Sequence, residues 1–357
     1  MNASLIGPLG RAAYALGQGA RVGLFWGQYL LSARLTTPVK APRPIEGPFP
    51  DRQRILADLR ALLARDLANI EAGFYRLPHD LIETPARALA QARAYFAELR
   101  EVERRRHARA HDEVLNDEAL REARRDGRYP RYYLQNFHYQ SGGWLSRRSA
   151  ALYDHQVEVL FGGGADAMRR MALVPLHDVL KQRRVAETRL IDLASGTGRF
   201  LSFVKDNYPR LAATALDLSP AYLEEAQRQL KPWRGIDYVN AAAEATGLPD
   251  ASFDLVTCVF LFHELPRKVR RQVAAEAFRI LKPGGRFILV DSIQQGDVAG
   301  YDGLLDYFPV AFHEPYYADY VRDDLHELFE SAGFTVISTD IAYFARLMVM
   351  EKRAPGS

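Results

Sequence analysis

A short run of small residues between Asp192 and Gly198 has the composition of a loop that binds a nucleotide-like cofactor. It reads Asp-Leu-Ala-Ser-Gly-Thr-Gly, follows an apolar stretch and precedes a helical pattern. Residues without bulky side chains, here Ala194 and Gly196, let the backbone approach a ligand closely. Asp217 stands 25 residues after Asp192, where a carboxylate can accept hydrogen bonds from two ribose hydroxyls. The spacing predicts a cofactor site at the ends of two neighbouring strands.

Three features separate this pattern from the dinucleotide-binding fingerprint. That fingerprint requires a third glycine where this chain has Leu201. The Lys-Pro-Gly-Gly run from Lys282 to Gly285 predicts a sharp turn into a fifth strand, and the fingerprint gives such a turn no role. Two apolar runs near the C-terminal end have almost no linker, so they must pair antiparallel. Together these features favour another class of cofactor-binding protein.

The elements that position these residues alternate between β-rich runs and helical patterns from about residue 186 onward. This alternation is typical of a parallel sheet with helices on both faces. The expected fold class is α/β, a doubly wound, mostly parallel seven-stranded sheet with a helical N-terminal region. The expected strands are 190–192, 213–217, 236–240, 254–260, 286–291, 334–338 and 341–350.

Three regions of different composition divide the chain. Residues 1–50 combine a Gly-rich aromatic segment with a Pro-rich linker, residues 51–185 are mainly helical, and residues 186–352 carry the sheet pattern. Apolar residues at helical spacing predict one helix over 55–70, and a second begins at Pro85 and extends to about Arg109. We expect residues 51–185 to form a substrate lid over the cofactor-binding domain.

The composition argues against several function classes. The net charge of +3 is too small to indicate nucleic-acid binding by itself. Cys258 is the one cysteine, which excludes a disulfide within the chain and nearly excludes cysteine-based zinc sites. The longest uncharged stretch near the start, 12 residues from Val22 to Ala33, is shorter than the roughly 20 needed to span a bilayer. We expect a cytoplasmic chain.

Residues 10–35 leave two interpretations open. Apolar and aromatic residues lie between Arg21 and Arg34, so a helix here would be amphipathic with cationic ends, as in membrane-surface anchors. The other interpretation is a helix packed on the body of the protein, or a mobile terminus. Peripheral membrane contact through residues 10–35 is therefore a hypothesis.

Residues 186–350 resemble the class I S-adenosylmethionine-dependent methyltransferases in the glycine loop, Asp217, the Lys-Pro-Gly-Gly run and the closing hairpin. The loop is particularly similar to that of the ubiquinone/menaquinone C-methyltransferase group. The resemblance covers under half of the chain. It implies that S-adenosyl-L-methionine is the cofactor and that its contacts come from Asp192, Ala194, Ser195, Gly196, Thr197, Gly198, Asp217, Leu218, Ala243, Glu244 and Phe260.

The resemblance also implies a role for each part of this set. The loop faces the methionine moiety, Asp217 holds the ribose, Ala243 and Glu244 flank the adenine, and Phe260 lies near the transferred methyl group. The family often has Asp immediately before the Ala-Glu pair, where this chain has Ala242. One expected hydrogen bond to adenine is then missing, and the backbone N–H of Ala243 is left to supply specificity.

Methyl transfer from a sulfonium requires a positioned acceptor and, for some acceptors, a base. His263 follows the fourth strand and is the first candidate, because an imidazole has an ordinary pKa of about 6.5. A structural histidine that caps the next helix is the alternative. His138 and His313 are secondary candidates. Glu264 is expected to point elsewhere on a helix, which argues against a direct His–Glu dyad, and no metal is expected.

Two aromatic patches predict where the acceptor binds. One lies around residues 129–144 and the other over 312–317, and both mix flat apolar surface with hydrogen-bonding groups, as ligand pockets do. They favour a small lipophilic or aromatic acceptor, quinone-like or polycyclic, although the first patch could instead be a seam between domains. The predicted contacts are Tyr132, Tyr133, Asn136, Gln140, Trp144 and Tyr316.

Two other functions stay open at this stage. An O-methyltransferase of a soluble phenol or polyketide would use the same base candidates. A partner protein that binds the cofactor without turnover would have no need to keep the complete set of Asp192, Gly196, Gly198 and Asp217. The complete set therefore favours an enzyme of small-molecule biosynthesis.

Overall fold

The computed structural model of the chain describes residues 6–37, 44–45, 47–108, 122–123, 125–135, 137–139 and 143–354. Within these ranges, no helix combines the length and apolarity that a bilayer crossing requires.

A seven-stranded sheet forms the centre of the molecule, with strand order β3-β2-β1-β4-β5-β7-β6. The first five strands in this order are parallel, and β7 is antiparallel to both of its neighbours. The predicted fold class is confirmed. The strands are β1 (Arg189–Leu193), β2 (Ala212–Asp217), β3 (Ile236–Asn240), β4 (Phe253–Val259), β5 (Leu281–Ser292), β6 (Thr335–Ala342) and β7 (Ala345–Glu351).

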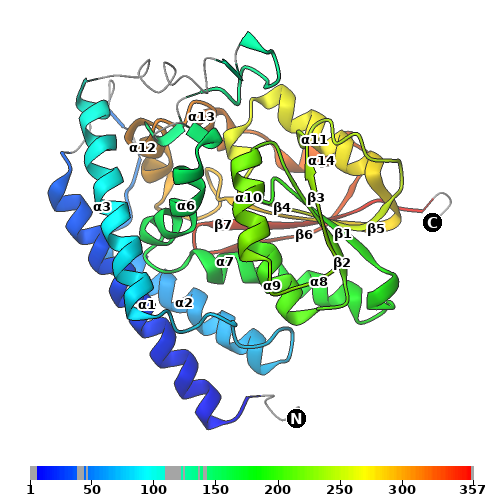
Figure 1. Cartoon of the computed structure of the whole chain (residues 1–357), viewed down its shortest axis with the longest axis horizontal. Helices are drawn as coiled ribbons and strands as arrows, with labels where there is room; N and C mark the ends of the chain where they lie inside the picture. Colours follow the sequence, from blue (N-terminus) through cyan, green and yellow to red (C-terminus); the bar gives the residue numbers. More distant parts are fainter. Residues whose placement is uncertain are drawn as a thin grey trace.

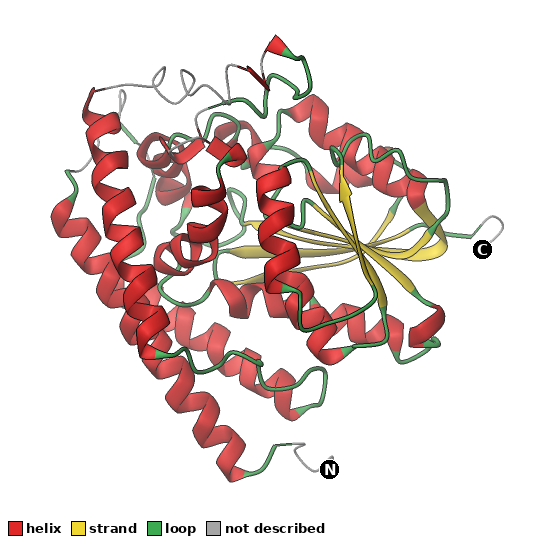
Figure 2. Cartoon of the chain, viewed as in Figure 1, coloured by secondary structure: helices red, strands yellow, loops and turns green. Residues whose placement is uncertain are grey.

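Helices cover both faces of the sheet, because its central strands carry apolar residues on alternate sides. In β1, Leu190 packs into one hydrophobic cluster and Ile191 into another, and in β4 Leu255 and Val256 divide in the same way. Figure 2 shows the sheet between the two helical layers. The first layer includes α8 (Leu173–Leu180), α9 (Arg199–Asn207) and α10 (Pro220–Gln229), and the second includes α11 (Arg267–Ile280) and α14 (Leu325–Ser331).

The N-terminal region adds three long helices, α1 (Pro8–Leu35), α2 (Arg52–Glu71) and α3 (Pro85–Ala108), followed by α6 (Arg147–Leu160) and α7 (Ala165–Met171). Figure 1 shows α1 along one flank of the molecule beside α2 and α3. The side chain of Asp51 accepts a hydrogen bond from the Arg54 N–H and so caps the start of α2. Tyr14 and Leu59 belong to the same hydrophobic cluster as Leu190, so these helices share a core with the sheet.

Two local predictions were wrong. The predicted turn from Lys282 to Gly285 lies inside β5, where Gly284, at φ +75°, donates to the Lys352 carbonyl and lets the strand continue. The turn of the closing hairpin lies at Tyr343 and Phe344, four residues later than expected, because Thr339 and Asp340 remain in the edge strand β6. An edge strand with exposed positions accepts such polar residues.

The insertion after β5 contains two helices that the sequence patterns did not predict. They are α12 (Asp302–Phe312) and α13 (Tyr317–Tyr320). Tyr317 and Tyr320 are buried, and the Tyr320 hydroxyl donates to the Ser292 carbonyl at the end of β5 at 2.6 Å. The insertion is therefore anchored to the end of the sheet at which the parallel strands terminate.

Candidate functional site

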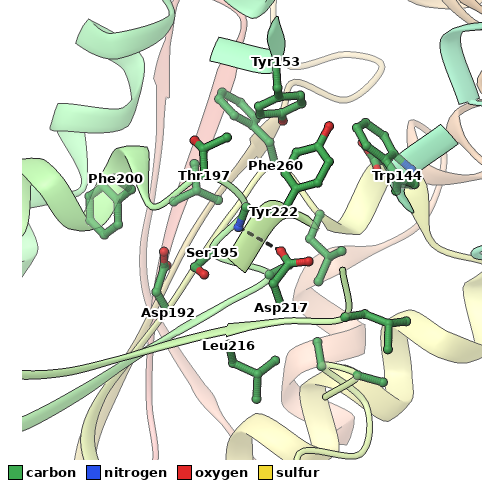
Figure 3. Close-up of a pocket in the computed structure, with 18 of the residues that line it drawn as sticks. Trp144, Tyr153, Asp192, Ser195, Thr197, Phe200, Leu216, Asp217, Tyr222 and Phe260 are labelled. Atoms are coloured by element: carbon green, nitrogen blue, oxygen red, sulfur yellow. Dashed lines mark hydrogen bonds between the residues drawn. The ribbon is translucent and has the colours of Figure 1, made fainter. Parts of the chain in front are cut away.

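A pocket of about 110 Å³ lies at the carboxyl ends of β1, β2 and β4. This is where ligands bind in open α/β sheets. One wall comes from the loop after β1, the end of β2 and the segment 241–244. The other comes from α6, α7, α10, the end of β4 and four aromatic residues, Tyr132, Tyr133, Phe137 and Trp144. In Figure 3, carboxylates lie on one side of the glycine-rich loop and aromatic rings gather on the other.

The loop after β1 is shaped by backbone conformations that favour glycine. Ala194 has φ +54° and Gly196 has φ +56°. The Gly196 N–H donates to the Asp217 carboxylate at 2.8 Å, which ties the loop to the end of β2 (Figure 3). A Cβ added at Gly196 would meet one neighbour within 4 Å, the Tyr222 ring at 3.9 Å. The backbone of Gly196 is therefore open toward the pocket, as the sequence predicted.

Gly198 differs from the rest of the predicted cofactor set because it does not line the pocket. A Cβ at this position would lie 2.6 Å from Leu230 in the first helical layer. Gly198 also has φ +75° and precedes the first residue of α9. Gly198 therefore permits close packing of the loop against α10 and the residue after it, and its expected contact with the cofactor stays a prediction.

Asp192 and Asp217 are buried carboxylic acids in this pocket. Asp192 accepts a hydrogen bond from the Thr257 hydroxyl at 2.6 Å, and burial raises the pKa of Asp192 to about 7. Asp217 accepts from the backbone N–H groups of Gly196 and Ser219, both at 2.8 Å. Burial raises the pKa of Asp217 to about 6, and these two hydrogen bonds oppose the increase. Asp217 can thus ionise near neutral pH and accept ligand hydroxyls.

The pocket fits a polar ligand with an adenosyl group. Ser195 Oγ is buried and has no hydrogen-bond partner among the described residues, so a ligand atom would satisfy it. Leu218, Ala243 and Glu244 line the wall beyond Asp217, where the resemblance places the ribose and the adenine. The Tyr132 hydroxyl donates to the Glu244 carboxylate and holds that side chain at the edge of the pocket.

Three aromatic rings form a box beside the loop. Trp144 lies 5.7 Å from Tyr222 and 5.8 Å from Tyr153, and the last two rings are 5.6 Å apart, all in edge-to-face contact. Such pairs stabilise one another and leave flat apolar surface for a ligand. Figure 3 shows these rings near Phe260, which directly follows β4 and has φ +59°. Tyr153 and Tyr222 were not predicted, since both occupy ordinary core positions of α6 and α10.

The other predicted acceptor contacts divide into three groups. Tyr132 and Tyr133 line the pocket together with Trp144. Tyr316 does not line it and instead packs 6.3 Å from Phe137. Asn136 and Gln140 lie outside the described residues.

Arg169 and Asp154 are among the charged residues of the pocket that were also missed. The Arg169 guanidinium lies 5.5 Å from the centre of the Phe260 ring. The Thr197 hydroxyl donates to Asp154 at 2.9 Å, which fixes the loop residue against α6. Neither position belongs to a recognisable motif, because α6 and α7 reach the pocket only through tertiary packing.

The three predicted base candidates do not line the pocket. His263 Nδ1 lies 2.6 Å from the buried Asp291 carboxylate. Burial would lower the pKa of His263, but Asp291 outweighs it and raises the pKa to about 9. A protonated, paired imidazole is a poor base at neutral pH. His138 pairs with Glu314 at 2.9 Å, and His313 ends α12 at φ +53°.

Glu264 lines the pocket, contrary to the expectation that it points elsewhere. It belongs to a 3-10 turn (Phe262–Glu264), and in this turn its neighbour His263 faces Asp291 instead. The turn, rather than the expected helix, brings Glu264 to the end of β4 beside Phe260 and Leu261.

Comparison with known proteins gives the same assignment for the central part of the domain. Residues 190–285 match the family model of a methyltransferase domain. The chain is similar to a ubiquinone/menaquinone biosynthesis C-methyltransferase from Methylobacterium nodulans, at 35% identity over 45% of this chain and 62% of that protein. It is also similar to a malonyl-[acyl-carrier protein] O-methyltransferase from Paenibacillus sp., at 27% identity over 49% of this chain and 60% of that protein.

The similarity is partial in both directions. The chain covers between 54% and 62% of the length of its first three curated relatives, all C-methyltransferases of ubiquinone/menaquinone biosynthesis. A solved structure, a putative sarcosine dimethylglycine methyltransferase from Galdieria sulphuraria, covers 52% of this chain at 12% identity with a TM-score of 0.42, so the sheet order above, not this likeness, defines the fold. Residues 190–285 therefore match a methyltransferase domain, and the chain is similar there to the S-adenosylmethionine-dependent C-methyltransferases of ubiquinone/menaquinone biosynthesis.

Proposed function

We propose that this protein is an S-adenosylmethionine-dependent methyltransferase whose acceptor is a small lipophilic or aromatic molecule, quinone-like or polycyclic. The observation that carries the proposal is the junction of two surfaces in one pocket. The open loop at Gly196 and the Asp217 carboxylate face the same cavity as the box of Trp144, Tyr153 and Tyr222. When bound, the cofactor would supply a methyl group already activated on a sulfonium.

The side chains of the pocket would then have separate tasks. Asp217 would accept hydrogen bonds from the ribose hydroxyls, and Ser195 would pair with a polar group of the methionine moiety. The aromatic box would hold a planar acceptor and exclude water. Trp144 and Tyr153 come from the region 51–185, which supports the predicted role of that region as a cover over the acceptor.

An O-methyltransferase acting on a soluble phenol or polyketide is the second candidate, and the similarity to an O-methyltransferase favours it. The same pocket could serve either reaction, so identification of the methylated atom in the product separates them. A partner protein that binds the cofactor without turnover is the third candidate, which the test below also addresses.

Calorimetric titration with S-adenosylmethionine and S-adenosylhomocysteine tests the proposal, with NAD as a control ligand. Both adenosyl ligands should bind in the micromolar range, and NAD should not. Asp217→Ala should weaken binding by roughly 1.5–3 kcal/mol, the value of hydrogen bonds to a charged group. Wild-type affinity in this variant would refute the ribose assignment, and binding of NAD alone would overturn the proposal. Binding without turnover over a panel of quinols would favour the third candidate.

The orientation of α1 supports peripheral contact with a membrane, which would suit a lipophilic acceptor. Several of its polar side chains point inward, where Tyr14 donates to Asp66 at 2.6 Å and Arg21 to Asp166 at 2.7 Å, whereas Arg11 and Arg34 near its two ends are exposed. Its outward face carries apolar side chains, of which Leu9 is 88% and Leu16 is 76% exposed. Exposed glycines occupy this face between Leu16 and Leu31. A helix with polar residues inside and leucines outside is the reverse of the usual pattern for a surface helix.

A further inference from the structure

A group of buried acidic and imidazole side chains lies directly behind the end of β4. Glu264 lines the pocket, and its Oε1 lies 3.9 Å from His263 Nε2. Behind it are Asp291, paired with His263, and Glu314, which lies 2.9 Å from His138. Glu314 is fully buried, and neither of its oxygens has a well-aligned hydrogen bond to a described residue.

The charges in this group are arranged as two pairs and one remaining acid. Burial opposes protonation of both histidines, but Asp291 raises the pKa of His263 and Glu314 raises that of His138. Each of these two carboxylates therefore faces its own imidazole and favours its protonated form. Glu264 is the member that lines the pocket, and its carboxylate makes no hydrogen bond to the described residues.

The environment of Glu264 suits reversible proton uptake near neutral pH. Burial raises the pKa of Glu264 to about 8, an effect that His263 opposes and Glu314 reinforces. A general base works best when its pKa lies near the operating pH. The titratable groups that act on it or that it acts on are His263, Glu314, His138, Asp291, Tyr153 and Tyr222.

A second observation in the same pocket points to a ligand that carries oxygen. Trp144 lines the cavity, is 7% exposed, and its indole Nε1 has no hydrogen-bond partner among the described residues. A buried N–H without a partner is costly, and an oxygen of the acceptor would satisfy it.

We propose that Glu264 is the proton-accepting catalytic residue of the pocket and that the acceptor carries an ionisable hydroxyl group, as a phenol or hydroquinone does. The inference rests on the proposed function and narrows its acceptor class. The acceptor O–H bond breaks, the proton binds a carboxylate oxygen of Glu264, and the electron pair stays on the acceptor as an anion. The resulting anion is a stronger nucleophile toward the methyl group. Glu264 returns the proton to solvent after turnover.

Infrared difference spectroscopy of the whole protein across pH 5–10 tests the proton site without any acceptor. The difference between the wild-type and Glu264→Gln spectra should contain a protonated-carboxyl band that disappears with a midpoint near pH 8, apart from the bands of Asp192 and Asp217, whose pKa values of about 7 and about 6 both proteins share. Glu330→Gln, the same change at an exposed position of α14, is the matched control and should keep the band. A band that Glu264→Gln leaves unchanged, or a midpoint below about pH 5, would overturn the proposal.

Two neighbouring variants should move this midpoint in opposite directions. His263→Gln removes a cation that favours the carboxylate, so the midpoint should rise by about one pH unit. Glu314→Gln removes a like charge, so the midpoint should fall by a similar amount. A merely structural role for these positioning residues would change stability without this pair of opposite shifts. Identical midpoints in both variants would contradict the arrangement.

Turnover with 1,4-dihydroxynaphthalene as the phenolic probe completes the test. Glu264→Gln should lower kcat at pH 8 at least about 100-fold, while its affinity for S-adenosylmethionine stays within twofold of wild type. In the wild type, kcat/KM should rise about tenfold per pH unit below pH 8 and then level off. Full activity of Glu264→Gln would sink the inference. Failure of the wild type to bind S-adenosylmethionine would instead refute the proposed function. The infrared midpoints would still test whether Glu264 takes up a proton near pH 8.

Discussion

The two halves of the pocket differ in how the chain assembles them. The cofactor half, formed by residues 192–197, 217–218 and 241–244, comes from three consecutive strand ends, and its shape depends largely on backbone conformation. The acceptor half comes from segments that meet only in the folded protein. It consists of Tyr132, Tyr133, Phe137, Trp144, Tyr153, Asp154, Arg169, Tyr222 and the end of β4. Parallel strands bring consecutive loops to one edge automatically. No comparable local rule predicts which side chains from distant segments form the acceptor half.

We expect the largest effects from substitutions at Gly196 and Gly198, which should affect cofactor binding and stability, respectively. Gly196→Val should abolish S-adenosylmethionine binding, because its side chain would project into the open pocket. Gly198→Ala should keep measurable binding and lose about 1–3 kcal/mol of unfolding free energy, because its Cβ would press against Leu230. Calorimetric titration and thermal unfolding of both variants measure the two quantities. Equal loss of binding without destabilisation in both variants would break the distinction between the two glycines.

A second test concerns the cost of buried charge in the cofactor half. Asp192 has a pKa of about 7 in the folded protein, against roughly 3.9 in an unfolded chain. Folding therefore takes up a proton between these pH values, and wild-type stability falls as the pH rises through this window. Asp192→Asn lacks this loss, so its stability relative to wild type should increase by about 2 kcal/mol between pH 5 and pH 8.

Urea unfolding at the two pH values measures this difference. Asp237→Asn, at an exposed position of β3, provides the control and should show no such gain. If Asp192→Asn lost stability relative to wild type as the pH rose, ionisation of the buried Asp192 carboxylate would not destabilise the wild-type protein.

The smallest effect should concern access of the acceptor from a membrane. Leu9→Glu and Leu16→Glu place charges on the outward face of α1 and leave its inward polar contacts intact. Flotation with vesicles containing anionic lipid should show wild-type protein bound, and the double variant bound roughly tenfold less. Ile337→Glu, at a 49% exposed position of β6, is the matched control. Equal partitioning of all three proteins would contradict membrane contact through α1.

The sequence predicted the cofactor half well and the acceptor half poorly, for the same physical reason. Four of the seven expected strands, β1 to β4, lie within one residue of the observed strands at both ends, because apolar runs bounded by turn residues define them locally. β5 begins five residues early because Gly284 lets Lys-Pro-Gly-Gly join the strand, and the turn between β6 and β7 lies four residues later than expected. All predicted cofactor residues except Gly198 line the pocket.

Local sequence patterns predicted only some of the residues of the acceptor half correctly. His263 was preferred over Glu264 on the ordinary pKa of imidazole, and the 3-10 turn reverses which of the two side chains faces the cavity. Asp291, which pairs with His263, lies near the end of β5. No sequence motif links these two residues. Tyr153 and Tyr222 resemble ordinary core residues until the helices are docked. Their roles depend on contacts between distant segments.

The position of Arg21 has a consequence for the history of the chain. Arg21 of α1 and Arg199 of α9 both pair with Asp166 of α7, and Arg199 is the first residue after the glycine-rich loop. Removing one partner of a buried pair typically costs about 3–5 kcal/mol. A recombination event that exchanged the N-terminal region for an unrelated one would leave Asp166 with fewer cations beside the loop. The stability of the loop region therefore depends in part on a side chain from the N-terminal helix α1.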